Sequence, residues 1–157
     1  MIRPSKSEDT VALIALAEAT GLFPPDGLEL LRQMLTETFE SSKDNDSFWL
    51  TDNDDGPVGV AYCEPERMAD GTWNLQMILI HPDRQEQGRG TRLLQFVEQE
   101  VTARSGRMLI IDTSGVPEFE RTRAFYAKCG YEAEARIRDF YAVGDDKVVF
   151  RKVLTGA

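Results

Sequence analysis

The segment from Ile80 to Leu94 constrains this chain more than any other part of its sequence. An apolar run ends at Pro82, a polar turn with Gly88 and Gly90 follows, and apolar residues at helical spacing begin directly afterwards. The first turn of a helix leaves backbone N–H groups without internal partners, and the helix dipole makes that end positive. Because glycine has no side chain, an anion can approach this backbone closely. The segment therefore predicts a strand, a phosphate-binding turn and a helix.

The spacing of the glycines excludes two common phosphate loops. A dinucleotide-binding turn needs a third glycine three residues after the second, but position 93 is leucine. A Walker loop needs a lysine before its Ser or Thr, whereas Thr91 follows Gly90. Taken alone, the turn also fits an unrelated α/β binding module in which it is only a helix start.

Length, charge and composition limit the classes of protein that the chain can belong to. Its 157 residues are enough for one domain, 1–157, with a core that needs neither disulfides nor metals. A formal net charge of −9 argues against a nucleic-acid partner, because phosphates would be repelled. There is no apolar run of membrane-spanning length and no signal-peptide core, so we expect a cytoplasmic protein without a membrane partner. Cys63 and Cys129 form no metal or redox motif and are expected to be structural.

Hydrophobic periodicity and turn residues predict the order of the elements. In the first half we expect a strand at 2–4, a helix from an N-cap at Ser7 to Ala19, a helix around 28–39, a loop at 41–47, a hairpin of strands 48–51 and 58–63, and a strand at 73–80. In the second half we expect a helix ending near 105, a strand at 107–112 buried on both faces, a helix at 120–128, and strands at 134–141 and 147–154. This order predicts a single α/β domain with a mixed sheet and helices on both of its sides.

Two motifs resemble the GNAT superfamily of N-acetyltransferases. The pattern Gln85-x-x-Gly88-x-Gly90 resembles the superfamily's coenzyme A pyrophosphate loop, and the segment 125–131, Phe-Tyr-Ala-Lys-Cys-Gly-Tyr, resembles its F-Y-x-x-x-G-F helix end. The order of elements is similar to that of the family from residue 1 to about 154. Two positions depart from the family pattern: Thr122 replaces an alanine, and Phe119 replaces an asparagine that contacts the pantetheine arm in many relatives.

The resemblance implies a fold and a cofactor. The fold is the GNAT fold, a mixed, mostly antiparallel, twisted central sheet of about six or seven strands with helices on both faces. The cofactor is acetyl-CoA, whose pyrophosphate would bind the glycine loop and whose pantetheine would add to the preceding strand like an extra strand. The N–H of Ile78 would donate to the acetyl oxygen. The cofactor-binding residues that the resemblance implies are Ile78, Leu79, Ile80, Gln85, Gln87, Gly88, Arg89, Gly90 and Thr91.

The resemblance also implies catalytic residues. Tyr126 is the expected general acid for the leaving thiolate, although a tyrosine at an aromatic helix end also fits a core position. Asn74 aligns with a glutamate that is the base in histone-acetylating relatives, and an amide cannot accept a proton, so we expect Glu64 at the end of the preceding strand to be the base. Weaker candidates, expected to be solvated charges, caps or structural residues, are Asp70, Asp112, Asp139 and His81.

The expected reaction is acetyl transfer from acetyl-CoA to a primary amine of a small molecule or peptide, by direct attack and without a metal. The family places the acceptor between the first helices, the loop before the central strand and the final hairpin, which here means 23–25, 64–73 and 138–141. Within these segments, Trp73 and Phe140 could belong to the core as well as to the acceptor surface. A non-catalytic acyl-CoA sensor of the same fold and a homodimer stay open as alternatives.

Overall fold

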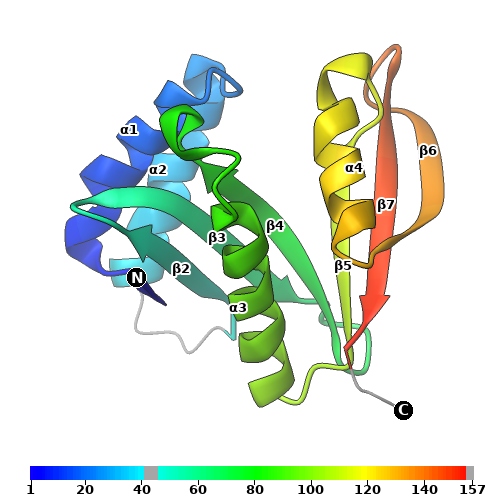
Figure 1. Ribbon diagram of the computed structural model, residues 1–157, viewed down its shortest axis with the longest axis horizontal. Helices are drawn as coiled ribbons and strands as arrows, with labels where there is room; N and C mark the ends of the chain where they lie inside the picture. The colour runs from blue at the N-terminus through cyan, green and yellow to red at the C-terminus, as the bar shows by residue number, and fades with distance from the viewer. Residues whose placement is uncertain (41–45, 155–157) are drawn as a thin grey trace. The chain divides into compact units, whose positions relative to one another are not determined.

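The structure is a computed structural model that describes residues 1–40 and 46–154, so much of the loop expected at 41–47 lies outside the described residues. Seven strands are hydrogen-bonded in the order β1-β2-β3-β4-β5-β7-β6 (Figure 1). The β1–β2, β2–β3, β5–β7 and β6–β7 ladders are antiparallel, whereas β4 and β5 run parallel. The predicted mixed, mostly antiparallel sheet is confirmed.

The chain divides into two compact units, and each unit is assembled from two segments. The first consists of Met1–Cys63 with Met77–Val97, and the second of Glu64–Gln76 with Glu98–Ala157. A single domain over 1–157 stays a prediction. In the described part of the chain, none of the helices combines the length and the apolar character that crossing a membrane requires.

The first unit packs two helices on three strands near the N-terminus. Its elements are β1 (Ile2–Pro4), the 3-10 turn η1 (Ser7–Asp9), α1 (Thr10–Ala19), α2 (Pro25–Glu40), β2 (Phe48–Asn53) and most of β3 (Pro57–Pro65). Proline suits the first position of α2 because its fixed φ is helical and its missing N–H would have no partner there. The core between α1, α2 and the strands contains Leu13, Ile14, Leu16, Ala17, Leu31, Leu35, Trp49, Val60, Tyr62 and Leu79.

The start of the first helix differs from the prediction. Ser7 is not the N-cap of α1, because the chain first forms η1 and α1 begins only at Thr10. Asp9 causes the difference: its carboxylate forms a two-point contact with the Arg3 guanidinium, at 2.8 and 2.9 Å, and accepts a hydrogen bond from the backbone N–H of Lys6 at 2.8 Å. The pair ties β1 to the helix entry, so the tight turn replaces a serine cap.

A strand–helix–strand crossover follows. Its elements are β4 (Thr72–Ile80), the short 3-10 turn η2 (Pro82–Arg84), α3 (Arg89–Ala103) and β5 (Met108–Ser114). Parallel strands require such a connection, and a helix is its usual form. The parallel ladder contains four residue pairs, from Thr72↔Met108 to Leu75↔Ile111.

The burial of β5 corrects one prediction. The nearly apolar run at 107–112 was expected to be buried on both faces, but burial alternates along β5. Leu109, Ile111 and Thr113 are buried, whereas the intervening residues are only half-buried. Alternation is the pattern of a strand with one fully covered face. Asp112 is therefore on the more open face of β5.

The second unit closes with one helix and a long hairpin. Its remaining elements are η3 (Pro117–Phe119), α4 (Glu120–Lys128), β6 (Glu132–Ala142) and β7 (Asp145–Val153) (Figure 1). Tyr126 of α4 packs on Phe150 of β7, with ring centroids 5.6 Å apart. The carboxylate of Glu98 accepts a hydrogen bond from the Tyr131 hydroxyl at 2.6 Å and pairs with Lys152 at 3.2 Å.

Strand β6 is the edge of the sheet and is exposed along its whole length. It pairs with β7 alone, and all of its residues from Glu132 to Ala142 are exposed. Its register shifts between Ala133 and Ala135, as at a β-bulge. Charged side chains and bulges protect an edge strand against pairing with other chains.

Gly106 is required by the packing between the end of α3 and the start of β4. A Cβ added there would clash with Cγ1 of Val101 and lie 2.8 Å from Cδ1 of Trp73. Both neighbours are buried, so neither can move away at low cost.

We expect Gly106→Ala to lower the free energy of unfolding by about 1–3 kcal/mol, because the methyl group overpacks the core. Urea unfolding followed by circular dichroism measures the change. Gly144→Ala is the control: Gly144 has φ +83° and nothing within 4 Å of an added Cβ, so it tests backbone strain without a clash. A loss at Gly106 no larger than that at Gly144 would show that the helix end relaxes around the methyl group.

Candidate functional site

The glycine loop of the first unit has the conformation that an anion-binding helix start requires. Gly88 directly precedes α3 and has φ +78°, a conformation that other residues adopt only at a cost. The backbone N–H of Arg92 donates to Gly88 O at 3.1 Å and closes the first helical turn. The N–H groups of Arg89, Gly90 and Thr91 have no acceptor among the described residues. A Cβ at position 88 would meet nothing within 4 Å, so the loop is open beside Gly88.

The two glutamines of the motif shape the loop from within. The side chain of Gln85 donates to the backbone oxygen of Ile80 at 3.2 Å, and Gln87 accepts a hydrogen bond from Arg89 Nε at 3.4 Å. Nδ1 of His81 accepts a hydrogen bond from the N–H of Asp83 at 3.1 Å, which fits the structural role expected for this residue. The loop is thus held by its own side chains.

The arginines of the loop are paired with the preceding hairpin. The guanidinium of Arg89 contacts Asp52 at 3.0 Å and Asp54 at 2.6 Å, and Arg84 contacts Asp54 at 2.7 Å. The pKa of Arg89 is raised, mainly by its hydrogen bond to Asp52. The pKa of Asp54 is lowered, mainly by its hydrogen bond from Arg84. These guanidinium groups fix the loop to β2 and its turn. The Arg89 side chain is therefore occupied by these contacts. Arg92 is the cationic side chain near the helix start that has no ion pair within the described residues.

The strand before the loop alternates between core and more open positions. Leu79 is buried in the core of the first unit, and Ile78 and Ile80 on either side of it are half-buried. All three lie beyond the last residue pair of the β4–β5 ladder. The side chains of these residues are buried or half-buried. Their backbone groups on the β5 side take no part in the β4–β5 ladder.

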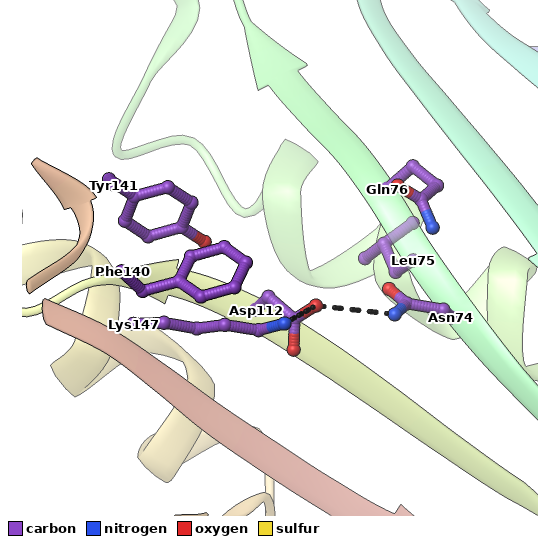
Figure 2. Close-up of a pocket in the computed structure, with 7 residues that line it drawn as sticks. All are labelled: Asn74, Leu75, Gln76, Asp112, Phe140, Tyr141 and Lys147. Atoms are coloured by element: carbon purple, nitrogen blue, oxygen red, sulfur yellow. Dashed lines mark hydrogen bonds and ion pairs between the residues drawn. The ribbon is translucent and has the colours of Figure 1, made fainter. Parts of the chain in front are cut away.

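A pocket of about 350 Å³ lies in the second unit, where the β4–β5 ladder ends (Figure 2). This volume is at the lower end of the range for small-molecule sites. Strand β4 supplies one wall, and β5, β6 and β7 supply the other residues. The lining residues are Asn74, Leu75, Gln76, Asp112, Phe140, Tyr141 and Lys147.

A chain of polar contacts crosses the floor of this pocket. The carboxylate of Asp112 pairs with Lys147 at 3.3 Å and accepts a hydrogen bond from the side-chain amide of Asn74, also at 3.3 Å (Figure 2). The same amide nitrogen donates to Glu66 at 3.2 Å. Asp112 was expected to be a solvated surface charge or a cap, and this expectation is wrong, because its side chain is 23% exposed and held by two partners. Asn74 connects the two carboxylates.

Two aromatic residues of the edge strand form the apolar side of the pocket. Phe140 and Tyr141 are 51% and 46% exposed, and their rings are nearly perpendicular with centroids 5.0 Å apart. The ammonium group of Lys147 lies 4.4 Å from the Phe140 ring centroid. Desolvation, with Asp112 and Asp145 nearby, raises the pKa of Tyr141, so its hydroxyl stays neutral. The core position considered for Phe140 is wrong, whereas Trp73 is a core residue.

Tyr126 is held in a cluster of aromatic rings. It packs against Phe125, Tyr131 and Phe150, and only 5% of it is exposed. Burial is the main cause that raises the pKa of Tyr126 far above its ordinary value. No described residue forms a hydrogen bond with its hydroxyl. Among the described residues, every side-chain nitrogen or oxygen that is fully buried has a hydrogen-bond partner. The hydroxyl is therefore not enclosed by the rings around it.

Glu64 does not join the pocket. It lies near the end of β3, is half-buried and has contacts of its own. Glu64 and Tyr126 belong to the second unit, whereas the glycine loop belongs to the first. Sequence reasoning did not single out Lys147 or Gln76. The sequence signal was weak: β5 pairs Asp112 with Val149, and Lys147, two residues before Val149, reaches Asp112 only as a diagonal neighbour.

Comparison with known proteins agrees with this architecture. The family profile of the acetyltransferase (GNAT) domain matches residues 44–133. A protein assigned to the GNAT acetyltransferases of Desulfovibrio desulfuricans has a similar structure, with 29% identity, 99% of each chain covered and a TM-score of 0.91. No curated protein matches the chain.

Two further solved structures share the fold at lower identity. An aminoglycoside 6'-N-acetyltransferase complexed with coenzyme A has 17% identity and a TM-score of 0.80, with 100% of this chain and 98% of the other covered. The ribosomal-protein-S18-alanine N-acetyltransferase from Escherichia coli has 19% identity and a TM-score of 0.77, with 100% and 95% covered. The sheet, the glycine loop and the crossover define an acetyltransferase of the GNAT type. The chain belongs to the GNAT acetyltransferase family.

The paired arginines generate a prediction about the loop. Asp52 is buried, so water cannot replace it as the partner of Arg89. Asp52→Asn weakens this contact, and we expect the free energy of unfolding to fall by about 1–3 kcal/mol. Asp54→Asn is the matched control, because Asp54 bonds the same arginine from an exposed position and should have the smaller effect. Thermal unfolding of both variants measures the difference. Equal losses would show that the buried contact adds nothing to the exposed one.

Proposed function

We propose that the chain is an acetyl-CoA-dependent N-acetyltransferase that acetylates a primary amine of a small molecule or peptide. The observation that carries this proposal is the start of α3, where three backbone N–H groups directly after Gly88 have no acceptor among the described residues. Oriented N–H groups at a helix N-terminus are well suited to a pyrophosphate. Membership of the GNAT family, and a related fold complexed with coenzyme A, support the identity of the ligand.

We assign the cofactor contacts mainly to backbone groups. The N–H groups of 88–91 would hold the pyrophosphate, with Gln85 and Gln87 fixing the loop around it. Ile78, Leu79 and Ile80 lie beyond the β4–β5 ladder, which supports the addition of an extended pantetheine arm along this part of β4. The N–H of Ile78 would then donate to the acetyl oxygen as charge develops on it.

Acetyl-CoA would supply a thioester whose carbonyl carbon bonds to the amine nitrogen as its bond to sulfur breaks. The amine must lose a proton, and we assign its acceptance to Glu64, directly or through water. Asp112 is held by Lys147 and Asn74, so we assign it to binding rather than to proton transfer.

We assign the donor at the sulfur to Tyr126. Its raised pKa keeps the phenol protonated through the neutral and mildly alkaline range, so the donor is present wherever the amine is deprotonated. The same raised pKa makes complete transfer to a thiolate unfavourable. Tyr126 therefore acts by donating a hydrogen bond that strengthens as negative charge develops on the sulfur.

A non-catalytic acyl-CoA sensor is the second candidate, because the aromatic cluster around Tyr126 also fits a packing role. Both candidates bind the cofactor, and they differ in turnover. Thiol release in the presence of a panel of amines supports the enzyme, and cofactor binding without release supports the sensor.

The first test of this function concerns Gly90. Gly90 lies in α3 and is not among the positive-φ residues, so a side chain there suits the backbone and obstructs the pyrophosphate. We expect acetyl-CoA at a hundred times its dissociation constant to add about 2.7 kcal/mol to the stability of the wild-type protein. Gly90→Val should remove this thermal shift. Gly21→Val, in an open turn outside the loop, is strained because Gly21 has φ +69°, so its stability should fall while the shift on adding acetyl-CoA is kept. A shift retained by Gly90→Val would contradict the assigned phosphate site.

The second test concerns Tyr126. Tyr126→Phe keeps the ring packing and removes the hydrogen-bond donor, so kcat should fall by about a hundred- to a thousand-fold. KM for both substrates should change little, because the lost interaction strengthens only in the transition state. Phe125→Leu, which disturbs the same ring cluster without removing a hydroxyl, is the control. Full turnover by Tyr126→Phe would show that water protonates the thiolate.

A further inference from the structure

The pocket of the second unit contains one anionic and one cationic side chain, and they are in contact. Asp112 on β5 and Lys147 on β7 lie 3.3 Å apart, and their side chains are 23% and 19% exposed. The other lining residues are uncharged. The lining therefore has no net charge, although the chain as a whole carries −9.

The charge pair is held in place from both sides. Asn74 donates a hydrogen bond to Asp112 at 3.3 Å and thereby connects it to Glu66. On the other side, the Lys147 ammonium lies 4.4 Å from the Phe140 ring centroid, within reach of a cation–π contact. Figure 2 shows the carboxylate and the ammonium side by side between the β4 wall and the aromatic rings. A ligand therefore meets a fixed dipole.

This dipole selects among amines. A polycationic acceptor would bring further positive charge to Lys147, which costs binding free energy in a half-buried site. An amine without other charge could reach Asp112 only in competition with Lys147. A zwitterion complements both groups, because its ammonium can approach Asp112 while its carboxylate approaches Lys147.

The apolar side and the volume of the pocket restrict the acceptor further. About half of the surface of Phe140 and of Tyr141 is exposed, and Leu75 adds an aliphatic side chain to the lining of the pocket. A pocket of about 350 Å³ holds a molecule of the size of one or two amino-acid residues. Gln76 of the same pocket lies on β4 two residues before Ile78, the first residue of the segment assigned to the cofactor.

We propose that this pocket binds an α-amino acid or a very small peptide with an apolar or aromatic side chain, Asp112 receiving its amine and Lys147 its carboxylate. The proposal rests on the proposed function, because the amine that Asp112 positions is the one to be acetylated. It gives Lys147 a role in specificity and leaves the chemical step to other residues.

The experiment compares three acceptors with the same ring: phenylalanine, phenylalaninamide and 2-phenylethylamine. Thiol release from acetyl-CoA by the wild-type protein gives kcat/KM for each. We expect phenylalanine to exceed the amide by at least about tenfold, the usual effect of losing a charged hydrogen-bond partner. The amine of the amide is less basic and more often deprotonated at neutral pH, so a preference for the acid cannot come from amine reactivity.

Variants then assign the preference to a residue. Lys147→Met should raise KM for phenylalanine by about tenfold or more and leave that for 2-phenylethylamine unchanged or lower. Arg151→Met is the matched control: Arg151 is a cation on the same strand, it pairs with Glu134 outside the pocket, and its loss should affect no acceptor. If Lys147→Met does not fold, the comparison of phenylalanine with phenylalaninamide in the wild-type protein still tests the proposal.

Three results would contradict the proposal. Acetylation of the amide or the amine as efficiently as the acid overturns this inference and leaves the proposed function intact, as does an equal loss for all three acceptors in Lys147→Met. If no amine in a wider panel releases thiol, the proposed function falls and this inference falls with it.

Discussion

The short parallel ladder between β4 and β5 is the constraint on which the candidate site depends. Its four pairs end at Leu75 and Ile111, although both strands continue. The pocket forms where the ladder ends, with Gln76 and Asp112 as the next residue of each strand. Pairing that continued along both strands would occupy the backbone groups of β4 that we assign to pantetheine. A limited ladder thus provides both the pocket and a strand edge for a ligand.

A second constraint is the way in which charge is used in the two units. In the first unit, Arg84 and Arg89 hold the glycine loop to Asp52 and Asp54, and the anion site that we propose there depends on backbone donors. In the second unit, the pair of Asp112 and Lys147 is part of a pocket wall. Ion pairs of similar length therefore have different roles. The difference lies in whether a ligand can reach the pair.

Much of the fold could be predicted because its signals are local. The helix at 120–128 and the hairpin around Gly56 follow from periodicity and turn residues, and both are confirmed. Ser7 was mistaken for a cap because the competing contact, Arg3 with Asp9, joins a strand to a helix and has no local pattern. The half-open face of β5 was missed for a related reason. An apolar run does not reveal which of its faces the neighbouring elements cover.

The candidate site was less predictable than the fold. The glycine loop has a sequence signature, because its function depends on backbone geometry at fixed spacing. The pocket has none: Asn74, Asp112 and Lys147 come from three strands and meet only through the register of the sheet. Asp112 could be named as a charged residue, but its partners could not. Side chains that belong to different strands are identified by topology, which no single segment contains.

The exposed edge strand has a consequence for how such a protein can change. Phe140 and Tyr141 form one side of the pocket, yet they belong to β6, where every residue is exposed. Because each ring is about half exposed, replacing it removes less buried surface than replacing a core residue does. The buried residues around Tyr126, such as Phe150, and those of the β4–β5 ladder, such as Trp73 and Leu109, do not have this freedom. Acceptor preference can therefore diverge among descendants of this chain while the acetyl-transfer scaffold is inherited unchanged.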